Sequence, residues 1–197
     1  MGQMIVWGRP SSVNVQKVLW ALSERGMAFE NRVVGGKYGG TDTVEFAAMS
    51  PLPRVPVLQD GDLCLWESHA ILRYLAGGVA PLEDQWMEYA TSTLQPAFLR
   101  LFYEVVRTAP EDRTLDADAL VADFLAAVPP LEWQLEKTKW LGGDRFGMAD
   151  IAAGAMMYRA CDLCDPLSPQ VARWYGQLQA RDAYRDIVVT SYEELRG

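Results

Sequence analysis

Histidine is almost absent from this sequence, since the 197 residues contain only His69. A Ser-His-Asp triad would have to use this residue, which lies within an apolar helical pattern, so we do not expect that chemistry. Long apolar runs are also missing, because none approaches the roughly 18 residues of a membrane-spanning helix. No basic segment followed by an apolar one begins the sequence. We therefore expect no signal peptide and a cytoplasmic location.

Cysteine is scarce as well, with three residues at positions 64, 161 and 164. This number does not make a disulfide framework. Cys161 and Cys164 form a C-x-x-C motif, which is typical of redox-active sites and of halves of zinc sites. A zinc site needs about four ligands, and neither a second cysteine pair nor a nearby histidine is present. We expect reduced, buried thiols and no metal.

Positive charge is in the minority, with 18 Lys and Arg against 26 Asp and Glu, a formal net charge of −8. Binding to nucleic acid or to an anionic membrane needs a basic face, so we expect neither as a partner. Half of the residues are hydrophobic and 22% are charged, which is ordinary for a globular protein. The length fits one large domain or two small ones.

The first third of the chain alternates between strand and helix patterns. Short apolar runs predict strands at residues 4–7, 29–34, 55–59 and 63–66. Helical spacing predicts helices at residues 15–22, 41–49 and 70–75. Asp60-Gly61 between the last two strands is a hairpin signal. This order predicts an α/β layer whose mixed sheet has a parallel first pair and an antiparallel hairpin.

Strand patterns disappear after residue 76. Gly77-Gly78-Val79-Ala80-Pro81 is the one convincing linker, so we predict domains at residues 1–76 and 83–197 joined by a linker at 77–82. Helical spacing predicts helices at 86–105, 120–135 with an interruption at Pro129-Pro130, 148–163, 171–178 and near 184. The second domain is therefore predicted to be all-helical.

The loop after the first predicted strand leads into a helix and carries Ser11, Ser12 and Asn14. Backbone N–H groups at a helix start attract anions, and a serine hydroxyl or asparagine amide there can hold a ligand. The same residue types are common helix caps. Taken alone, this segment favours capping by Ser12 or Asn14 over ligand binding.

The segment from Arg54 to Leu58 places Pro56 at the start of a strand, beside the hairpin. X-Pro is the only peptide bond at which the cis form costs little. A cis bond would turn the Val55 backbone outward and leave its N–H and C=O free to pair with an extended peptide. An ordinary edge-strand proline explains the same pattern equally well.

Glu67 and Ser68 stand where the hairpin ends and a helix begins. Ser68 suits a helix cap, and Glu67 suits the positive end of the helix. The pair would also suit a ligand that carries an ammonium and a carboxylate. Glu67 would bind the ammonium, and the Ser68 hydroxyl with the helix amides would bind the carboxylate.

Together these segments resemble the glutathione-binding half of a glutathione S-transferase. Ser12-x-Asn14 with Lys17-Val18 resembles the thiol-activating loop of serine-type and bacterial members. Residues 54–58 resemble the family's cis-proline strand, 67–71 its γ-glutamyl site, and 143–151 the start of the buried helix in its helical domain. The resemblance covers essentially the whole chain. It implies a thioredoxin-like βαβαββα domain followed by an all-helical domain.

The resemblance also implies a function, the conjugation of the glutathione thiolate to a small hydrophobic electrophile by a homodimer that serves in detoxification. It assigns catalysis to Ser12 and Asn14, with Ser11 as the alternative to Ser12. It assigns glutathione binding to Val55, Pro56, Glu67, Ser68 and Lys37. It places the electrophile between the domains, where the candidate lining residues are Trp7, Phe102, Tyr103 and Tyr158.

Two segments depart from the family pattern. Gly147 stands where members often have Ser or Thr, so the hydroxyl half of a capping box is missing, and we expect Asp150 to bond the backbone there. Ser50-Pro51-Leu52-Pro53 replaces the usual Asn-Pro and small or basic residue. Two other functions stay open on this scaffold, a glutathione-dependent disulfide reductase or dehalogenase and a non-catalytic glutathione-binding module.

Overall fold

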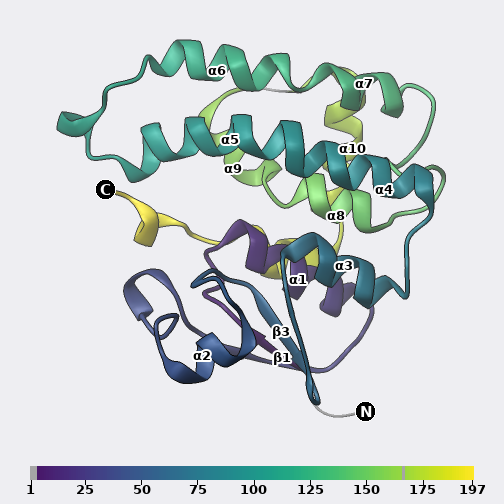
Figure 1. The fold of residues 1–197 in the computed structure, drawn as a ribbon. Coiled ribbons are helices and arrows are strands. Elements are labelled where there is room, and N and C mark those ends of the chain that lie inside the picture. Colours follow the sequence, from purple (N-terminus) through teal and green to yellow (C-terminus); the bar gives the residue numbers. More distant parts are fainter. Residues whose placement is uncertain (1–3, 166) are drawn as a thin grey trace.

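The computed structural model describes residues 4–165 and 167–197 (Figure 1). The first three residues, part of the segment in which a signal peptide was sought, lie outside the described residues. The N-terminal part contains β1 (Met4–Trp7), α1 (Val13–Glu24), β2 (Phe29–Arg32), η1 (Gly36–Tyr38), α2 (Val44–Met49), β3 (Val57–Asp60), β4 (Leu63–Trp66) and α3 (Ser68–Ala76). This is the predicted βαβαββα order.

The four strands form one mixed sheet in the order β2-β1-β3-β4. β1 pairs with β2 in parallel, and β3 pairs antiparallel with both β1 and β4. The parallel first pair and the Asp60-Gly61 hairpin were both predicted. β2 ends at Arg32 and β3 starts at Val57, so both are shorter than their apolar runs suggested.

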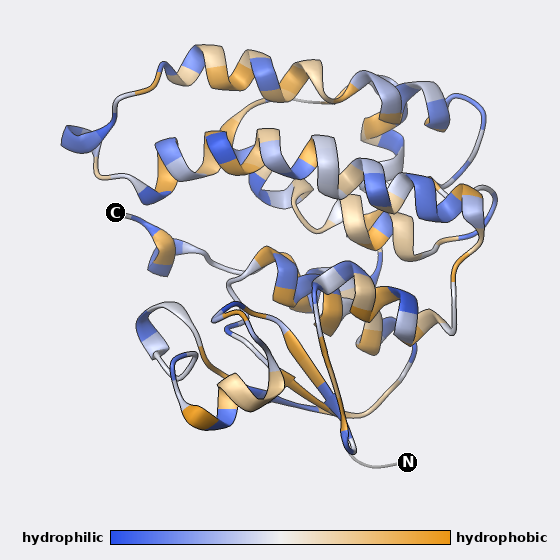
Figure 2. Ribbon diagram, viewed as in Figure 1, coloured by the Kyte–Doolittle hydropathy of each residue, from blue (hydrophilic) through white to orange (hydrophobic). Residues whose placement is uncertain are grey.

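The sheet is covered by helices on both faces, as the alternation of side chains along β1 requires. Met4 and Val6 point to the main core, which α1 and α3 share, whereas Trp7 points to a second cluster with Phe46 of α2 and Val57. In Figure 1, α1 and α3 lie between the sheet and the helical region, and α2 lies on the far side. The strands are accordingly orange along much of their length in Figure 2.

The rest of the described chain is helical. It contains α4 (Pro81–Tyr89), η2 (Ala90–Leu94), α5 (Gln95–Phe102), η3 (Tyr103–Arg107), η4 (Pro110–Asp112), α6 (Ala117–Ala126), α7 (Pro129–Leu135), α8 (Met148–Gly154), α9 (Met157–Leu163), α10 (Pro169–Gln179), α11 (Asp182–Ile187) and η5 (Glu193–Leu195). The thioredoxin-like fold with a helical C-terminal region is thus confirmed. No helix among the described residues combines the length and the apolar character needed to cross a membrane.

Three of the predicted helices differ in detail. The long helix over 86–105 contains two π-turns, η2 and η3, on either side of α5. The 120–135 helix is divided into α6 and α7 where Pro129 starts a new helix. The 148–163 helix breaks between Gly154 and Met157. The exact domain boundaries stay a prediction, with α3 ending at Ala76 and α4 starting at Pro81.

The buried helix α8 starts without a capping side chain at Gly147, and two carboxylates supply the missing contacts. Asp150 accepts hydrogen bonds from the backbone of Leu141 and Gly147, both at 3.0 Å, and from Trp174 Nε1 at 2.8 Å. Glu83 of α4 accepts from the Met148 N–H. A Cβ on residue 147 would lie 2.0 Å from Glu83 Oε1, so this carboxylate occupies the space where the usual Ser or Thr would be.

Candidate active site

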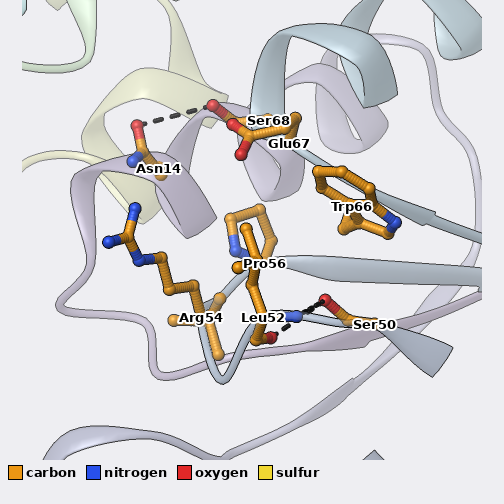
Figure 3. A pocket seen from close by; sticks show the side chains of 9 residues that line it. Asn14, Ser50, Leu52, Arg54, Pro56, Trp66, Glu67 and Ser68 are labelled. Atoms are coloured by element: carbon orange, nitrogen blue, oxygen red, sulfur yellow. Dashed lines mark hydrogen bonds between the residues drawn. The ribbon is translucent and has the colours of Figure 1, made fainter. Parts of the chain in front are cut away.

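Two pockets meet at the start of α1. The first is lined by residues of the β3 and β4 ends and of the α1 and α3 starts, namely Asn14, Ser50, Leu52, Arg54, Val55, Pro56, Trp66, Glu67 and Ser68. Figure 3 shows Trp66 and Arg54 on opposite sides of it, with Asn14, Glu67 and Ser68 along one rim. Five of the predicted site residues therefore share one pocket, although the prediction took them from three separate segments.

The Val55–Pro56 peptide bond is cis, as the sequence suggested. Val55 is partly buried and lies just before β3. Within the described part of the chain, neither its N–H nor its C=O has a hydrogen-bond partner. A polar backbone of this kind at the wall of a pocket is suited to pair with an extended peptide ligand.

Asn14 is held in one orientation by two other helices. Its Oδ1 accepts hydrogen bonds from Ser68 Oγ of α3 at 3.4 Å and from Gln95 Nε2 of α5 at 3.1 Å. Gln95 Oε1 in turn accepts from the ammonium of Lys17 at 2.5 Å. Because both contacts use the oxygen, the Asn14 NH2 group is left to donate to a ligand.

Lys17 and His69 form the buried end of this network. Lys17 Nζ lies 3.1 Å from His69 Nε2, and both side chains are buried. Burial lowers the pKa of Lys17 to about 7, against the opposing effect of Glu67. Burial, assisted by the charges of Lys17 and Arg73, lowers the pKa of His69 to about 3. The imidazole is therefore neutral near pH 7 and acts as a hydrogen-bond partner of Lys17, away from either pocket.

Glu67 has a strained backbone. With φ 70° it is the only residue other than glycine at positive φ in the described ranges. A non-glycine residue in this region costs about 1–3 kcal/mol and is found mainly at functional sites. Ser68 is the first residue of α3, its hydroxyl bonds Asn14, and Glu67 holds the cap position without a side-chain bond. The capping explanation of Ser68 is therefore wrong, because this hydroxyl faces the site.

The second pocket lies on the other side of Asn14, between the loop before α1 and the helices α5 and α9. It is lined by Arg9, Ser11, Ser12, Val13, Asn14, Gln95, Phe98, Leu99, Phe102, Tyr103, Arg107, Arg159 and Leu195. Ser12 occupies the N-cap position of α1, yet its side chain makes no capping bond. Its hydroxyl is partly buried and free at the junction of the pockets. Capping was the more favoured explanation of this serine, and the structure does not bear it out.

Ser11 is more deeply buried than Ser12, and its carbonyl accepts a hydrogen bond from Arg159 at 2.9 Å. Its hydroxyl has no hydrogen-bond partner of good geometry among the described residues. It nevertheless lies near enough to Glu194 to help lower the pKa of that carboxylate. Ser11 therefore serves the contact between the α1 loop and the C-terminal helices, whereas Ser12 faces the junction.

Two of the four residues predicted for the electrophile pocket lie elsewhere. Phe102 and Tyr103 line the second pocket. Trp7 does not, because strand alternation turns its indole to the α2 face, where it packs with Phe46 and Val57. Tyr158 also does not line this pocket and packs instead beside Tyr192, with ring centroids 6.3 Å apart.

Lys37 lies on the glycine-rich loop and is paired within the chain. Its Nζ is 2.7 Å from Glu194 Oε2, and the Tyr38 hydroxyl donates to the same oxygen at 2.7 Å. Lys37, with Ser11 and Tyr38, lowers the pKa of Glu194 to about 2. A ligand carboxylate at Lys37 would therefore have to displace Glu194.

The C-x-x-C motif lies at the end of α9. Cys161 and Cys164 are free and partly buried. Burial raises the pKa of Cys161 to about 12 and also raises that of Cys164. These thiols are therefore protonated near pH 7 and are poor nucleophiles. Among the described residues, no group of three or more His, Cys, Asp or Glu side chains has the arrangement to hold a metal ion.

Several residues of the site escaped prediction from the sequence. Gln95, Arg9, Arg107 and Arg159 line the second pocket. Arg159 lies 148 positions from Ser11, to which it donates. No local pattern links residues so far apart. The one available signal was arginine within otherwise apolar helical segments, which is unusual for a core position.

Comparison with known proteins identifies the family of this chain. The family model described as "Glutathione S-transferase, N-terminal domain" matches residues 2–77. Glutathione S-transferase GstB of Escherichia coli (strain K12) is 37% identical over 203 residues, which cover 93% of this chain and 97% of that protein. A glutathione S-transferase of Hyoscyamus muticus is 30% identical, covering 92% and 95%.

A solved structure agrees with these sequence relatives. The theta class glutathione S-transferase from the citrus canker pathogen Xanthomonas axonopodis pv. citri, with glutathione bound, superposes with a TM-score of 0.90. It is 38% identical, and the match covers 98% of this chain and all of that one. The pockets described above are thus the site of a member of this family: the chain belongs to the glutathione S-transferases.

Proposed function

We propose that this protein is a glutathione transferase that binds glutathione in the first pocket and an electrophile in the second. The observation that carries the proposal is the free Ser12 hydroxyl at the junction of the pockets, at the N-terminus of α1. A relative 38% identical to this chain was solved with glutathione bound, which supports the same co-substrate here.

In the proposed mechanism, Ser12 Oγ donates a hydrogen bond to the glutathione sulfur, and the Asn14 NH2 group donates a second. The thiolate is the nucleophile, and a free thiol has a pKa of roughly 8.5. One hydrogen bond to a charged group stabilises it by about 1.5–3 kcal/mol, which lowers the thiol pKa by about one to two units. The N-terminus of α1 acts in the same direction.

The first pocket offers complementary groups for the rest of the tripeptide. We propose that the Val55 backbone, beside Pro56, pairs with the cysteine residue of glutathione. Glu67 would bind its γ-glutamyl ammonium, and Ser68 with the first amides of α3 its carboxylate. Lys37 would bind the glycine carboxylate after Glu194 is displaced. The exposed Arg54 at the opposite wall is a further cation for a carboxylate.

The proposal is tested by exchanging the two neighbouring serines. Ser12→Ala should lower kcat at saturating glutathione about 10- to 100-fold, because one hydrogen bond to the developing thiolate is lost. Ser11→Ala is the matched control and should keep kcat within about threefold, since its hydroxyl faces Glu194. A normal rate in Ser12→Ala with a large loss in Ser11→Ala would show that the wrong serine was chosen.

We propose that the protein is a cytoplasmic homodimer with a detoxifying role, as is usual for its family. Sedimentation equilibrium measures the oligomeric state directly. Aromatic side chains of 86–105 were expected to form much of the dimer interface, but Trp86, Phe98 and Phe102 are buried in the protomer core. A dimer would have to use the opposite, polar face of this segment, which includes Thr91 and Ser92.

A further inference from the structure

Three arginines converge on the second pocket. Arg9 follows β1, Arg107 ends the π-turn η3, and Arg159 lies on α9. They share the walls of a cavity of about 110 Å³ with the rings of Phe98, Phe102 and Tyr103. An apolar electrophile alone would need only the aromatic part of this lining.

Arg159 is buried to an unusual degree for an arginine, with 2% of its surface exposed. Its Nη2 donates to the Ser11 carbonyl at 2.9 Å and to Gln16 Oε1 at 3.3 Å, but both acceptors are uncharged. Its Nε is buried and lacks a hydrogen-bond partner. A buried cation without a counter-ion is costly, so such groups are normally paired or bind a ligand.

The other two arginines are unpaired as well. Arg9 has a buried Nε without a hydrogen-bond partner, and the Arg107 guanidinium lies 4.5 Å above the Tyr103 ring. Within residues 4–165 and 167–197, neither of them nor Arg159 forms a salt bridge. The positive charge of Arg9 adds to burial in lowering the pKa of Arg159 to about 10. All three remain charged near pH 7.

The carboxylate that borders this pocket is engaged elsewhere. Glu194 precedes Leu195, one of the lining residues, but its Oε2 bonds Lys37 and Tyr38. The protein as a whole carries a net charge of −8, so a cluster of unpaired cations runs against its general charge. The pocket therefore offers strong, directed donors for an anion beside aromatic rings for an apolar body.

Building on the proposed function, we propose that the electrophile carries a carboxylate, which Arg159, Arg9 and Arg107 bind while its apolar body packs on the aromatic rings. The reacting carbon would then face Ser12 and the glutathione sulfur. In a chloroarene of this class, the thiolate attacks the ring carbon and a C–S bond forms. The C–Cl bond breaks, chloride leaves with its electron pair, and the thiol proton passes to solvent.

The test compares two electrophiles of nearly equal size, 4-chloro-3,5-dinitrobenzoate and 4-chloro-3,5-dinitrobenzamide, with the spontaneous reaction subtracted. The wild type should show at least a tenfold higher kcat/KM for the benzoate, relative to the ratio of spontaneous rates. Arg107→Gln and Arg9→Gln should each lower kcat/KM for the benzoate about 10- to 100-fold and change that for the amide less than threefold.

Arg100→Gln is the matched control, because Arg100 lies on α5, is exposed and pairs with Asp123 at 3.0 Å. It should change neither substrate. A wild-type enzyme without preference for the benzoate, or variants that lose both substrates equally, would overturn the carboxylate assignment and leave the transferase proposal intact. Failure to conjugate either reagent and to bind glutathione would overturn the transferase proposal itself, and the substrate assignment with it.

Discussion

Asn14 is the residue through which the two pockets are coupled. Its Oδ1 accepts from Ser68 of the α/β part and from Gln95 of the helical part. An amide fixed in this way presents its NH2 group at one position and loses little rotameric freedom when a ligand binds. The residues that direct Asn14 therefore contribute to the site without touching the sulfur.

Ser68→Ala should raise the KM for glutathione more than it lowers kcat. The proposed γ-glutamyl contact is remote from the sulfur, so its loss weakens the ground state and the transition state equally. Loss of a hydrogen bond to a charged group costs about 1.5–3 kcal/mol, or about 10- to 100-fold in KM. Since Ser68 does not cap α3, the melting temperature should stay close to that of the wild type. An unchanged KM would remove Ser68 from the glutathione site.

His69 should stay neutral far below the usual range, because its pKa is lowered to about 3 by burial and by the nearby Lys17. The chain has one histidine, so a single imidazole resonance reports this titration by NMR. We expect no titration between pH 8 and about pH 4.5 while circular dichroism shows a folded protein. The unfolded chain takes up a proton below its pKa of about 6.5 that the folded chain refuses, so this group reduces stability as pH falls toward 3. A midpoint near 6.5 in the folded protein would contradict the buried Lys17–His69 contact.

The start of α8 is the element on which the helical region depends most. Asp150 is fully buried and joins the 141–147 loop, α8 and Trp174 of α10 through its two oxygens. Glu83 adds a contact from α4 across the glycine. One short helix is thereby tied to three other segments by carboxylates.

Asp150→Asn should destabilise the fold. The new NH2 group replaces an acceptor with a donor facing a backbone N–H, and the loss of a charged acceptor costs about 1.5–3 kcal/mol. In a chain of this size that lowers Tm by about 3–12 °C. Asp123→Asn is the matched control on the surface, because its exposed pair with Arg100 should contribute almost nothing. Equal melting temperatures for the two variants would contradict the role given to Asp150.

Local patterns predicted the elements well because strand alternation, helical spacing and the Asp60-Gly61 turn are written in neighbouring residues. They also suggested the cis bond at Pro56. They could not predict which face of the sheet Trp7 occupies, because alternation alone does not say which side α2 covers. The cap from Glu83 and the contact of Arg159 with Ser11 join distant segments. For that reason the glutathione side of the site was largely predicted and the arginine side was missed.

On the scale of the whole molecule, the C-terminal segment ties the helical region to the α/β part. Figure 1 shows it passing between the two and ending beside the α1 loop. Gln16 of α1 donates to the Ile187 carbonyl at 3.2 Å, and Glu194 bonds Lys37 and Tyr38. The last turn of the chain therefore borders the pocket that we assign to the electrophile and holds a residue that we assign to glutathione.

Glu194→Gln should strengthen glutathione binding. Lys37 is then freed for the glycine carboxylate, and the loss of an exposed competing ion pair should lower Kd about 1.5- to 5-fold in a titration followed by Trp66 fluorescence. Glu193→Gln is the matched control, because its carboxylate pairs with Arg196 and is exposed. Weaker binding in Glu194→Gln would instead indicate that Glu194 supports the bound state.

The central claim is that this site stabilises the glutathione thiolate through Ser12. The ultraviolet absorbance of the thiolate, followed against pH in the binary complex, measures the pKa of the bound thiol directly. We predict a value about one to two units below the roughly 8.5 of a free thiol, and a return most of the way to the free value in Ser12→Ala. A bound thiol that titrates like free glutathione in the wild type, or equally low in both proteins, would contradict this account.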